Sequence, residues 1–551
     1  MMLKSEQDIL MFTEKLVNVQ SVVNSSGEAN ISKYIYELIQ EWPYFQKNTD
    51  FVCKKQTLND SLERFNVYAF VKGTKSKHDH RTLILMGHTD TVGIDDYGHL
   101  KNKACFPNEL MEALTEEPLP EHIKKHLYSN EWYFGRGTLD MKAGVASHLY
   151  LLKYYSEHPE KLSGNLLFLA ASDEEDSSHG MISAVTHLNE FKKTYNFSYI
   201  GAINADFVTE HYTGDDNRYI YKGTIGKLLP SFYIKGVESH VGSPFSGIDP
   251  NYLAAHLTKQ ISYNPELCDT ALGETTVPPV SLKQTDLKPS YTVQTALAAF
   301  TYFNFFTFSW TPWEVLRRLK EQAKIAVNHA MAELNERYKQ FQMKMNESNQ
   351  TINFHPKVYL YEELYNQLVE QHGNKFSNHM EQFKENLLAD ESLDVRHYAM
   401  RVVEEASEWL EGNEPLIVLF YSSLYSPHMM LTRNDKREQN LLDALDQAIE
   451  NIQPLYEHPI QQKNFFPHIC DMSFLSLNMD LEAIDAIEQN NPAWGAKHNV
   501  DYAAVRELNI PSVNIGPYGF DAHSKHERME KTYATKIVPN ITKQMIDQLL
   551  S

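Results

Sequence analysis

The chain has 551 residues, which is too long for one hydrophobic core and implies at least two domains. It carries 51 Lys and Arg against 72 Asp and Glu, a formal net charge of −21. A phosphate backbone and an anionic membrane both repel surplus carboxylates, so this balance argues against nucleic acid and membrane as partners and predicts a soluble, acidic protein.

The four cysteines lie far apart, at positions 53, 105, 268 and 470, and form no CxxC pair. This spacing fits neither a zinc knuckle nor a disulfide framework. We therefore expect reduced, mostly structural thiols and a cytoplasmic location.

The first part of the chain alternates short apolar runs with helical patterns, as α/β proteins do. The runs 82–86, 165–171 and 199–205 predict buried strands, and residues 141–157 predict a helix. In open α/β sheets, ligands gather at the carboxyl ends of the strands. The polar residues that follow these runs are therefore candidates for a binding site.

After about residue 215 the pattern changes to aromatic-rich, strand-like segments at 219–237 and 291–309, with a helical stretch at 251–263 between them. This arrangement predicts a second, α+β domain. Residues 290–313 carry no charge, but they are rich in Thr and aromatic residues and poor in Leu, Ile and Val. Paired buried strands therefore explain this stretch better than a membrane span does.

Long polar helical patterns follow at 312–348 and 362–411. Buried-strand runs then return at 415–421 and 511–515. Because the α/β character resumes, we expect the second domain to be inserted into the first.

Histidines and carboxylates stand directly after the strand-like runs and in a Gly-rich segment. The motifs are Gly87-His88-Thr89-Asp90, Gly135-Arg136-Gly137-Thr138-Leu139-Asp140-Met141-Lys142, Asp173-Glu174-Glu175, Asn204-Ala205-Asp206 and Ala522-His523-Ser524-Lys525-His526-Glu527. Taken singly, each has an ordinary explanation, such as a structural His–Asp pair, a solvated acidic loop or a helix N-cap. Together they offer imidazole nitrogen and carboxylate oxygen without thiolate, which is a ligand set for a hydrolytic zinc, manganese or cobalt centre.

In this order, the motifs resemble those of the M20-type metallohydrolases. That family of zinc-dependent exopeptidases and deacylases includes aminoacylases, peptidase T, succinyl-diaminopimelate desuccinylase and glutamate carboxypeptidases. The pattern covers most of the chain, including residues 16–22. The length, the long helical insertion and the segment 465–473 look more narrowly like the arginine-utilisation branch of the family.

The resemblance implies a zinc-exopeptidase-like, three-layer α/β catalytic domain with an inserted α+β, ferredoxin-like lid domain that long helices extend. The expected division is a first part of the catalytic domain over 1–214, a lid of the dimerisation type over 215–361, and a helical return segment with the second part of the catalytic domain over 362–551. A homodimer through the lid is expected on the same ground.

By resemblance, Asp140 would bridge two divalent metal ions, with Zn expected and Mn or Co as alternatives. His88 and Asp206 would complete one ion's ligands, and Glu175 and His523 the other's. A bridging carboxylate makes chemical sense, since it partly neutralises two nearby dications.

Three further residues would act in catalysis. Asp90 lies two residues beyond His88 on an extended segment, so it can accept the other imidazole N–H and orient the ring. Glu174 would be the general base. His240, in the segment 238–244, would stabilise a tetrahedral oxyanion, in relatives commonly across a dimer interface.

These roles imply that metal-activated water cleaves a C–N amide bond of a small amino-acid-derived substrate, in amino-acid catabolism and more narrowly in arginine use. A di- or aminopeptidase is the alternative within the family. A non-catalytic relative that binds a metabolite or partner protein is the alternative of another class. Many relatives grip the substrate carboxylate with an arginine in a second-domain strand, whereas residues 303–307 here are aromatic or uncharged, which favours deacylation over peptide cleavage.

Overall fold

A computed structural model describes residues 3, 5–76, 78–347 and 350–551. The chain forms two compact units, and each is discontinuous in sequence. Unit 1 contains the chain up to residue 224 together with 429–478 and 501–551, and unit 2 contains 225–428 and 479–500. The sequence predicts different roles for 1–214, 215–361 and 362–551, and these roles stay predictions. Residues 362–428 belong to unit 2.

An eight-stranded mixed sheet forms the centre of unit 1, in the order β1-β2-β5-β3-β6-β19-β7-β18. Its strands are β1 (Val52–Gln56), β2 (Phe65–Lys72), β3 (Arg81–His88), β5 (Asn165–Ala171), β6 (Ser198–Asn204), β7 (Arg218–Tyr221), β18 (Ile460–Lys463) and β19 (Ser512–Asn514). β3 pairs in parallel with both β5 and β6. β3 is buried beyond its first residue and β5 throughout, as expected for central parallel strands that read as continuous apolar runs.

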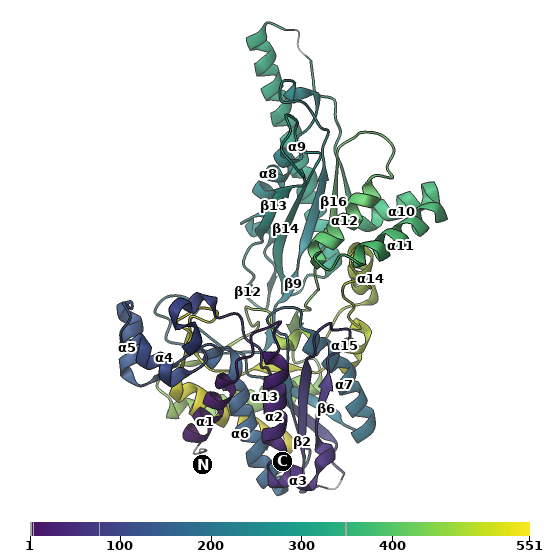
Figure 1. Ribbon diagram of the computed structural model, residues 1–551. Coiled ribbons are helices and arrows are strands. Elements are labelled where there is room, and N and C mark those ends of the chain that lie inside the picture. The colour runs from purple at the N-terminus through teal and green to yellow at the C-terminus, as the bar shows by residue number, and fades with distance from the viewer. Residues whose placement is uncertain (1–2, 4, 77, 348–349) are drawn as a thin grey trace. The chain divides into compact units, whose positions relative to one another are not determined.

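Helices of unit 1 pack on this sheet or on the helices that cover it (Figure 1). They are α1 (Glu6–Asn18), α2 (Gly27–Gln40), α3 (Pro43–Lys47), α6 (Ala143–Glu157), α7 (His179–Tyr195), α13 (Lys436–Ile452), α15 (Tyr502–Leu508) and α16 (Val538–Leu550). α6 and α16 contact β3, whereas α7 contacts β2 and β5. The predicted strands and the helix predicted at 141–157 therefore correspond to β3, β5, β6 and α6.

A smaller sheet of unit 1 joins the C-terminal part of the chain to the segment 95–134, which lies between β3 and the Gly-rich motif. It pairs β20 (Gly519–Phe520), β21 (Arg528–Glu530) and β4 (Trp132–Phe134). Helices α4 (Pro107–Leu114) and α5 (Glu121–Ser129) contact β4. A separate pair consists of β8 (Gly223–Thr224) and β17 (Met429–Met430).

Unit 2 contains a second sheet, in the order β13-β14-β10-β16-β15 with β9 beside β14. Its strands are β9 (Gly226–Leu228), β10 (Pro230–Lys235), β13 (Val280–Asp286), β14 (Ala298–Thr307), β15 (Lys357–Leu360) and β16 (Leu416–Tyr421), and β11 (Thr270–Ala271) and β12 (Glu274–Thr275) form a hairpin. With α8 (Pro250–Ile261) and α9 (Pro312–Met345), the elements run β10-α8-β13-β14-α9-β16, and neighbours among these strands are antiparallel. This is the β-α-β-β-α-β arrangement of ferredoxin-like folds, which confirms the predicted α+β domain.

Long helices extend unit 2, as predicted. α10 (Tyr361–His372), α11 (Asn374–Leu388) and α12 (Val395–Ser407) cover one face of the sheet through Phe300, Val418 and Phe420, and α14 (Leu481–Asn490) belongs to the same unit. α9 begins with a capping box between Thr311 and Glu314.

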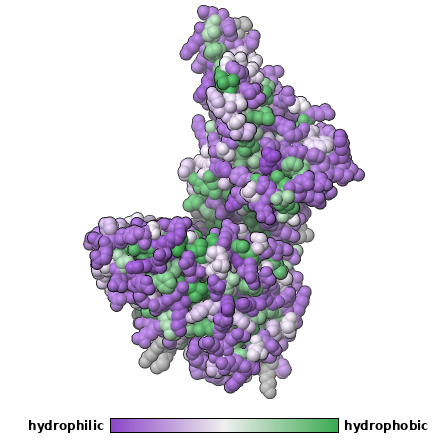
Figure 2. All heavy atoms as spheres, viewed as in Figure 1, coloured by the Kyte–Doolittle hydropathy of each residue, from purple (hydrophilic) through white to green (hydrophobic). Residues whose placement is uncertain are grey.

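The uncharged stretch 290–313 contributes β14 instead of a long apolar helix. Within the described ranges, no helix combines the length and apolar character needed to cross a bilayer. Most of the face drawn in Figure 2 is hydrophilic, with smaller groups of hydrophobic side chains.

Candidate metal centre

Three neighbouring strands of unit 1 bring predicted ligands to one edge of the sheet. His88 is the last residue of β3, while Glu175 and Asp206 lie in the loops that follow β5 and β6. β3 lies between β5 and β6 and is parallel to both, so the carboxyl ends of the three strands meet.

Asp140 stands between two imidazoles. Its Oδ1 lies 3.1 Å from Nε2 of His88, and its Oδ2 lies 3.0 Å from Nε2 of His523, a residue of the β20–β21 loop. Oε1 of Glu175 is 3.2 Å from the same His523 nitrogen. His88, Asp140 and Glu175 each offer a ligand atom within 4.8 Å of the others. A carboxylate that turns each oxygen toward a different imidazole is placed as a bridging ligand would be.

Asp206 is buried beside this group, with 3% of its surface exposed. Its backbone N–H donates to Oδ1 of Asn514, and its own Oδ1 accepts from the N–H of Phe207. Burial, followed by the charge of Asp140, raises its pKa well above the usual value. Asp206 therefore lies within electrostatic reach of Asp140.

The charges of the cluster favour a cation. Burial is the largest cause that raises the pKa of Glu174, Glu175 and Asp206, and neighbouring carboxylates raise it further. Burial also opposes ionisation of Asp140, but hydrogen bonds from His523 and His88 outweigh it and lower that pKa. Buried carboxylates ionise together only when positive charge compensates them. Two imidazoles and three carboxylates without thiolate therefore fit Zn²⁺, Mn²⁺ or Co²⁺.

Asp90 holds the loop that carries Glu174 and Glu175. Its carboxylate accepts from the backbone N–H of Glu174 at 3.2 Å and of Glu175 at 3.0 Å. Nδ1 of His88 lies 3.2 Å from the backbone oxygen of Asp90 and 3.6 Å from its Oδ1. Asp90 thus lies beside this imidazole nitrogen, with its carbonyl oxygen nearer than its carboxylate, and its role in orienting the ring stays a prediction.

Glu174 is placed close to His88. Its Oε2 is 3.8 Å from Nε2 of His88, and 11% of its side chain is exposed. Burial raises its pKa well above the usual value, while His88 opposes that rise. A carboxyl group with a raised pKa can accept and return a proton near neutral pH.

His240 belongs to unit 2 and is exposed there. Its Nδ1 accepts from the backbone N–H of Gly242 at 3.0 Å, within the Gly/Pro-rich segment. Its role toward an oxyanion stays a prediction.

Residues 84–536 match the model of peptidase family M20/M25/M40. The chain is also 35% identical over 538 residues to Protein RocB of Bacillus subtilis (strain 168), which covers 98% of this chain and 94% of that protein. The chain belongs to peptidase family M20/M25/M40. It is therefore a metallohydrolase of the M20 family, as the motifs predict.

Other M20-like matches agree. The chain is 32% identical over 551 residues to the uncharacterized protein YqjN of the same organism, with 99% of this chain and 97% of that protein covered. The fold matches the M20 family metallo-carboxypeptidase Sso-CP2 from Sulfolobus solfataricus, with a TM-score of 0.52, 11% identity, and 98% and 99% of the two chains covered. Aminopeptidase PepT from Bacillus cereus ATCC 10987 matches with a TM-score of 0.51, 12% identity, and 99% and 98% coverage.

Arg136 and Glu527 stand within the motifs without an assigned role, and the structure shows that Glu527 supports the turn that carries Asp140. Oε1 of Glu527 accepts from the backbone N–H groups of Leu139 and Asp140 at 3.1 and 3.2 Å. Its Oε2 accepts from Nη1 of Arg136 at 2.7 Å. The same guanidinium contacts Asp96, in the segment between β3 and the Gly-rich motif. Through these hydrogen bonds, Glu527 links the loop that carries His523 to the turn that carries Asp140.

Replacing Glu527 should weaken metal binding. We expect Glu527→Gln to lower zinc affinity roughly 10–100-fold, the usual effect of losing a group that orients ligands. Competition with a chromophoric chelator measures the change, and Glu131→Gln, an exposed carboxylate beside β4, is the matched control. Equal affinity in both variants would show that Glu527 does not support the site.

The segment 465–473 adds two more residues beside the centre. The ring of His468 stacks on Phe207, with centroids 5.5 Å apart, and His468 interacts electrostatically with Asp140 and His523. Asp471 is buried, and neither of its carboxylate oxygens has a hydrogen-bond partner within the described part of the chain. Burial, as the largest cause, raises its pKa to about 7. The sequence analysis singled out the segment 465–473 as a whole and gave neither His468 nor Asp471 a role.

Proposed function

We propose that this M20 enzyme hydrolyses the C–N amide bond of a small amino-acid-derived substrate in arginine catabolism. One observation supports this reaction: Asp140 lies between the Nε2 atoms of His88 and His523, and the carboxyl of Glu174 lies beside His88. The resemblance to the arginine-utilisation branch and the similarity to RocB support the pathway.

Five residues would hold two metal ions, with Zn²⁺ preferred. His88 and Asp206 would complete one ion's ligands and Glu175 and His523 the other's, while Asp140 would contact both. Bound ions would supply Lewis acidity toward a carbonyl oxygen and toward water.

Glu174 would move the protons. It would take one proton from the attacking water as the water oxygen bonds to the amide carbon. It would then deliver that proton to the amide nitrogen as the C–N bond breaks, so that a carboxylic acid and an amine leave. Asp90 holds the backbone N–H groups of Glu174 and Glu175 and so fixes where the base stands.

His240 would stabilise the oxyanion from the lid domain, as its segment resembles the family's. If it acts across a dimer interface, the active form would be a homodimer. Mixing His240→Ala chains with Glu174→Gln chains would then restore part of the activity that each variant lacks alone.

The second sheet bears on the substrate class. β14 contains no arginine, and the residues of 303–307 that face partly outward are Asn304 and Phe306. A clamp for a free α-carboxylate is thus missing from this strand. This supports deacylation or another amide cleavage over a di- or aminopeptidase.

A substrate panel tests the proposal. We expect the zinc-, manganese- or cobalt-loaded protein to cleave N-acyl amino acids, N-acylarginine among them, faster than di- and tripeptides. Blocking the α-carboxylate as an amide should change kcat/KM by less than about tenfold, since a lost charged hydrogen bond costs roughly 10–100-fold. Amine release is the measurement. Faster cleavage of peptides would favour a peptidase, and bound metal without turnover on any amide would favour a non-catalytic binder.

A further inference from the structure

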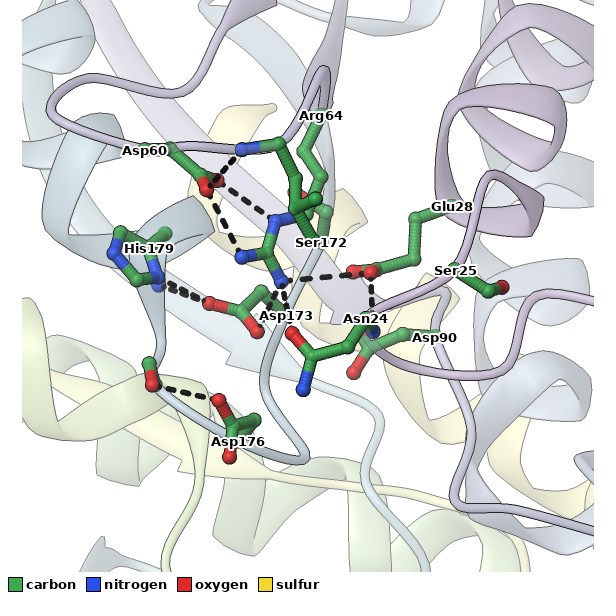
Figure 3. Close-up of polar contacts among 12 residues, drawn as sticks. Asn24, Ser25, Glu28, Asp60, Arg64, Asp90, Ser172, Asp173, Asp176 and His179 are labelled. Carbon is green, nitrogen blue, oxygen red and sulfur yellow. Dashed lines mark hydrogen bonds and ion pairs between the residues drawn. The ribbon is translucent and has the colours of Figure 1, made fainter. Parts of the chain in front are cut away.

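Buried ion pairs hold the 173–178 loop of unit 1 (Figure 3). The guanidinium of Arg64 contacts Asp173, lies 2.7 Å from Oδ2 of Asp60 and lies 3.4 Å from Oε2 of Glu28. The Arg64 side chain is 4% exposed, and all three carboxylates are fully buried. One planar guanidinium therefore serves three carboxylates from three separate segments.

Asp173 has an unusual backbone conformation. Its φ is 63°, in the left-handed region that residues other than glycine rarely adopt. Its Oδ2 accepts from the backbone N–H of His179 at 2.9 Å and lies 2.6 Å from Nδ1 of that imidazole. Its carbonyl accepts from the N–H of Ser178 at 2.6 Å. A residue keeps such a conformation only where several contacts hold it in place, as these contacts do here.

The residues directly after Asp173 are those that serve the metal centre. Asp90 accepts from the backbone N–H groups of Glu174 and Glu175, and Glu175 reaches His523. The loop is thus held by Asp90 at its two glutamates and by Arg64 and His179 through Asp173. Loss of Arg64 would leave Asp173 with only its His179 contacts, and loss of Asp90 would remove both hydrogen bonds at the two glutamates.

We propose that Arg64 is a positioning residue of the metal centre, acting through Asp173 on the backbone that carries Glu174 and Glu175. Arg64 itself contacts neither glutamate in any hydrogen bond or ion pair among the described residues. The part that concerns the base Glu174 rests on the proposed function, whereas the part that concerns Glu175 depends only on metal binding.

Lysine cannot replace this arginine fully. The guanidinium presents five N–H donors in a planar fork, whereas an ammonium is a compact point charge with three donors. Arg64→Lys should therefore keep the charge and restore only part of the geometry. Arg64→Met removes both and leaves three buried carboxylates without their cation.

The experiment measures the zinc affinity and the amide hydrogen exchange of Glu174 and Glu175 in four variants. We expect Arg64→Met and Asp173→Asn to weaken zinc binding roughly 10–100-fold and to speed exchange at both amides. Arg64→Lys should fall between them and the wild type. Asp176→Asn, an exposed carboxylate in the same loop, should behave as the wild type.

Asp173→Asn keeps the volume of the side chain and a residue type that tolerates the left-handed region, so it tests the inference if Arg64→Met fails to fold. Folded variants at both positions that bind zinc as tightly as the wild type would overturn the proposal. A wild type that binds zinc but cleaves no amide would refute the proposed function instead, and leave the zinc affinities of the Arg64 series informative.

Discussion

Glu174→Gln will retain bound metal and lose turnover. The substitution keeps the size of the side chain but removes the group that accepts a proton from water. General base catalysis contributes on the order of 10²–10⁴-fold, so kcat should fall by about that factor while KM changes little. Steady-state kinetics on the best amide substrate, together with metal analysis of the same preparation, measures both effects.

Two neighbours in the same loop serve as controls for Glu174→Gln. Glu175→Gln should lose metal as well as activity, because Oε1 of Glu175 faces the shared imidazole of His523 at 3.2 Å. Asp176→Asn should lose neither, since its exposed side chain bonds only to Ser177 in the described structure. Metal loss in Glu174→Gln would instead make Glu174 a ligand and end its assignment as the base.

Asp140→Asn will remove metal from both positions at once. One carboxylate faces both imidazoles, at 3.1 and 3.0 Å, and a neutral amide offers only one oxygen to two cations. We expect metal content to fall from about two ions per chain toward none after dialysis against a chelator that leaves the wild type loaded, and activity to fall with it. Inductively coupled plasma mass spectrometry gives the stoichiometry.

His523→Ala separates a bridging role from a terminal one. It should empty one position and leave the ion held by His88 and Asp206. If Asp140→Asn and His523→Ala lose the same single ion, Asp140 serves one position and the bridging assignment is wrong.

The central strands and the ligands beside them could be predicted for one physical reason. β3, β5 and β6 are buried on both faces, so their sequences are continuous apolar runs that stop where polar ligands begin. That the polar residues after these strands lie near one another follows from their position, because parallel strands end at one edge; the choice of His88, Glu175 and Asp206 as ligands came from the family resemblance. Asp140 and His523 lie outside that sheet, and the family resemblance located them.

The supporting residues could not be predicted, because their roles come from contacts between distant segments. Arg136 and Glu527 are 391 positions apart, and Arg64 and Asp173 are 109 positions apart. Helical periodicity predicted helices in the region of α10, α11 and α12 but not the sheet that they cover. An amphipathic pattern shows that one face of a helix is buried, but not which element it packs against.

A crystal structure of the zinc-loaded protein, with anomalous scattering recorded at the zinc edge, tests the central claim most directly. The account predicts two anomalous peaks that share Asp140, one ligated by His88 and Asp206 and the other by Glu175 and His523. Zinc peaks that lie away from these five side chains, or their absence from loaded crystals, would contradict it.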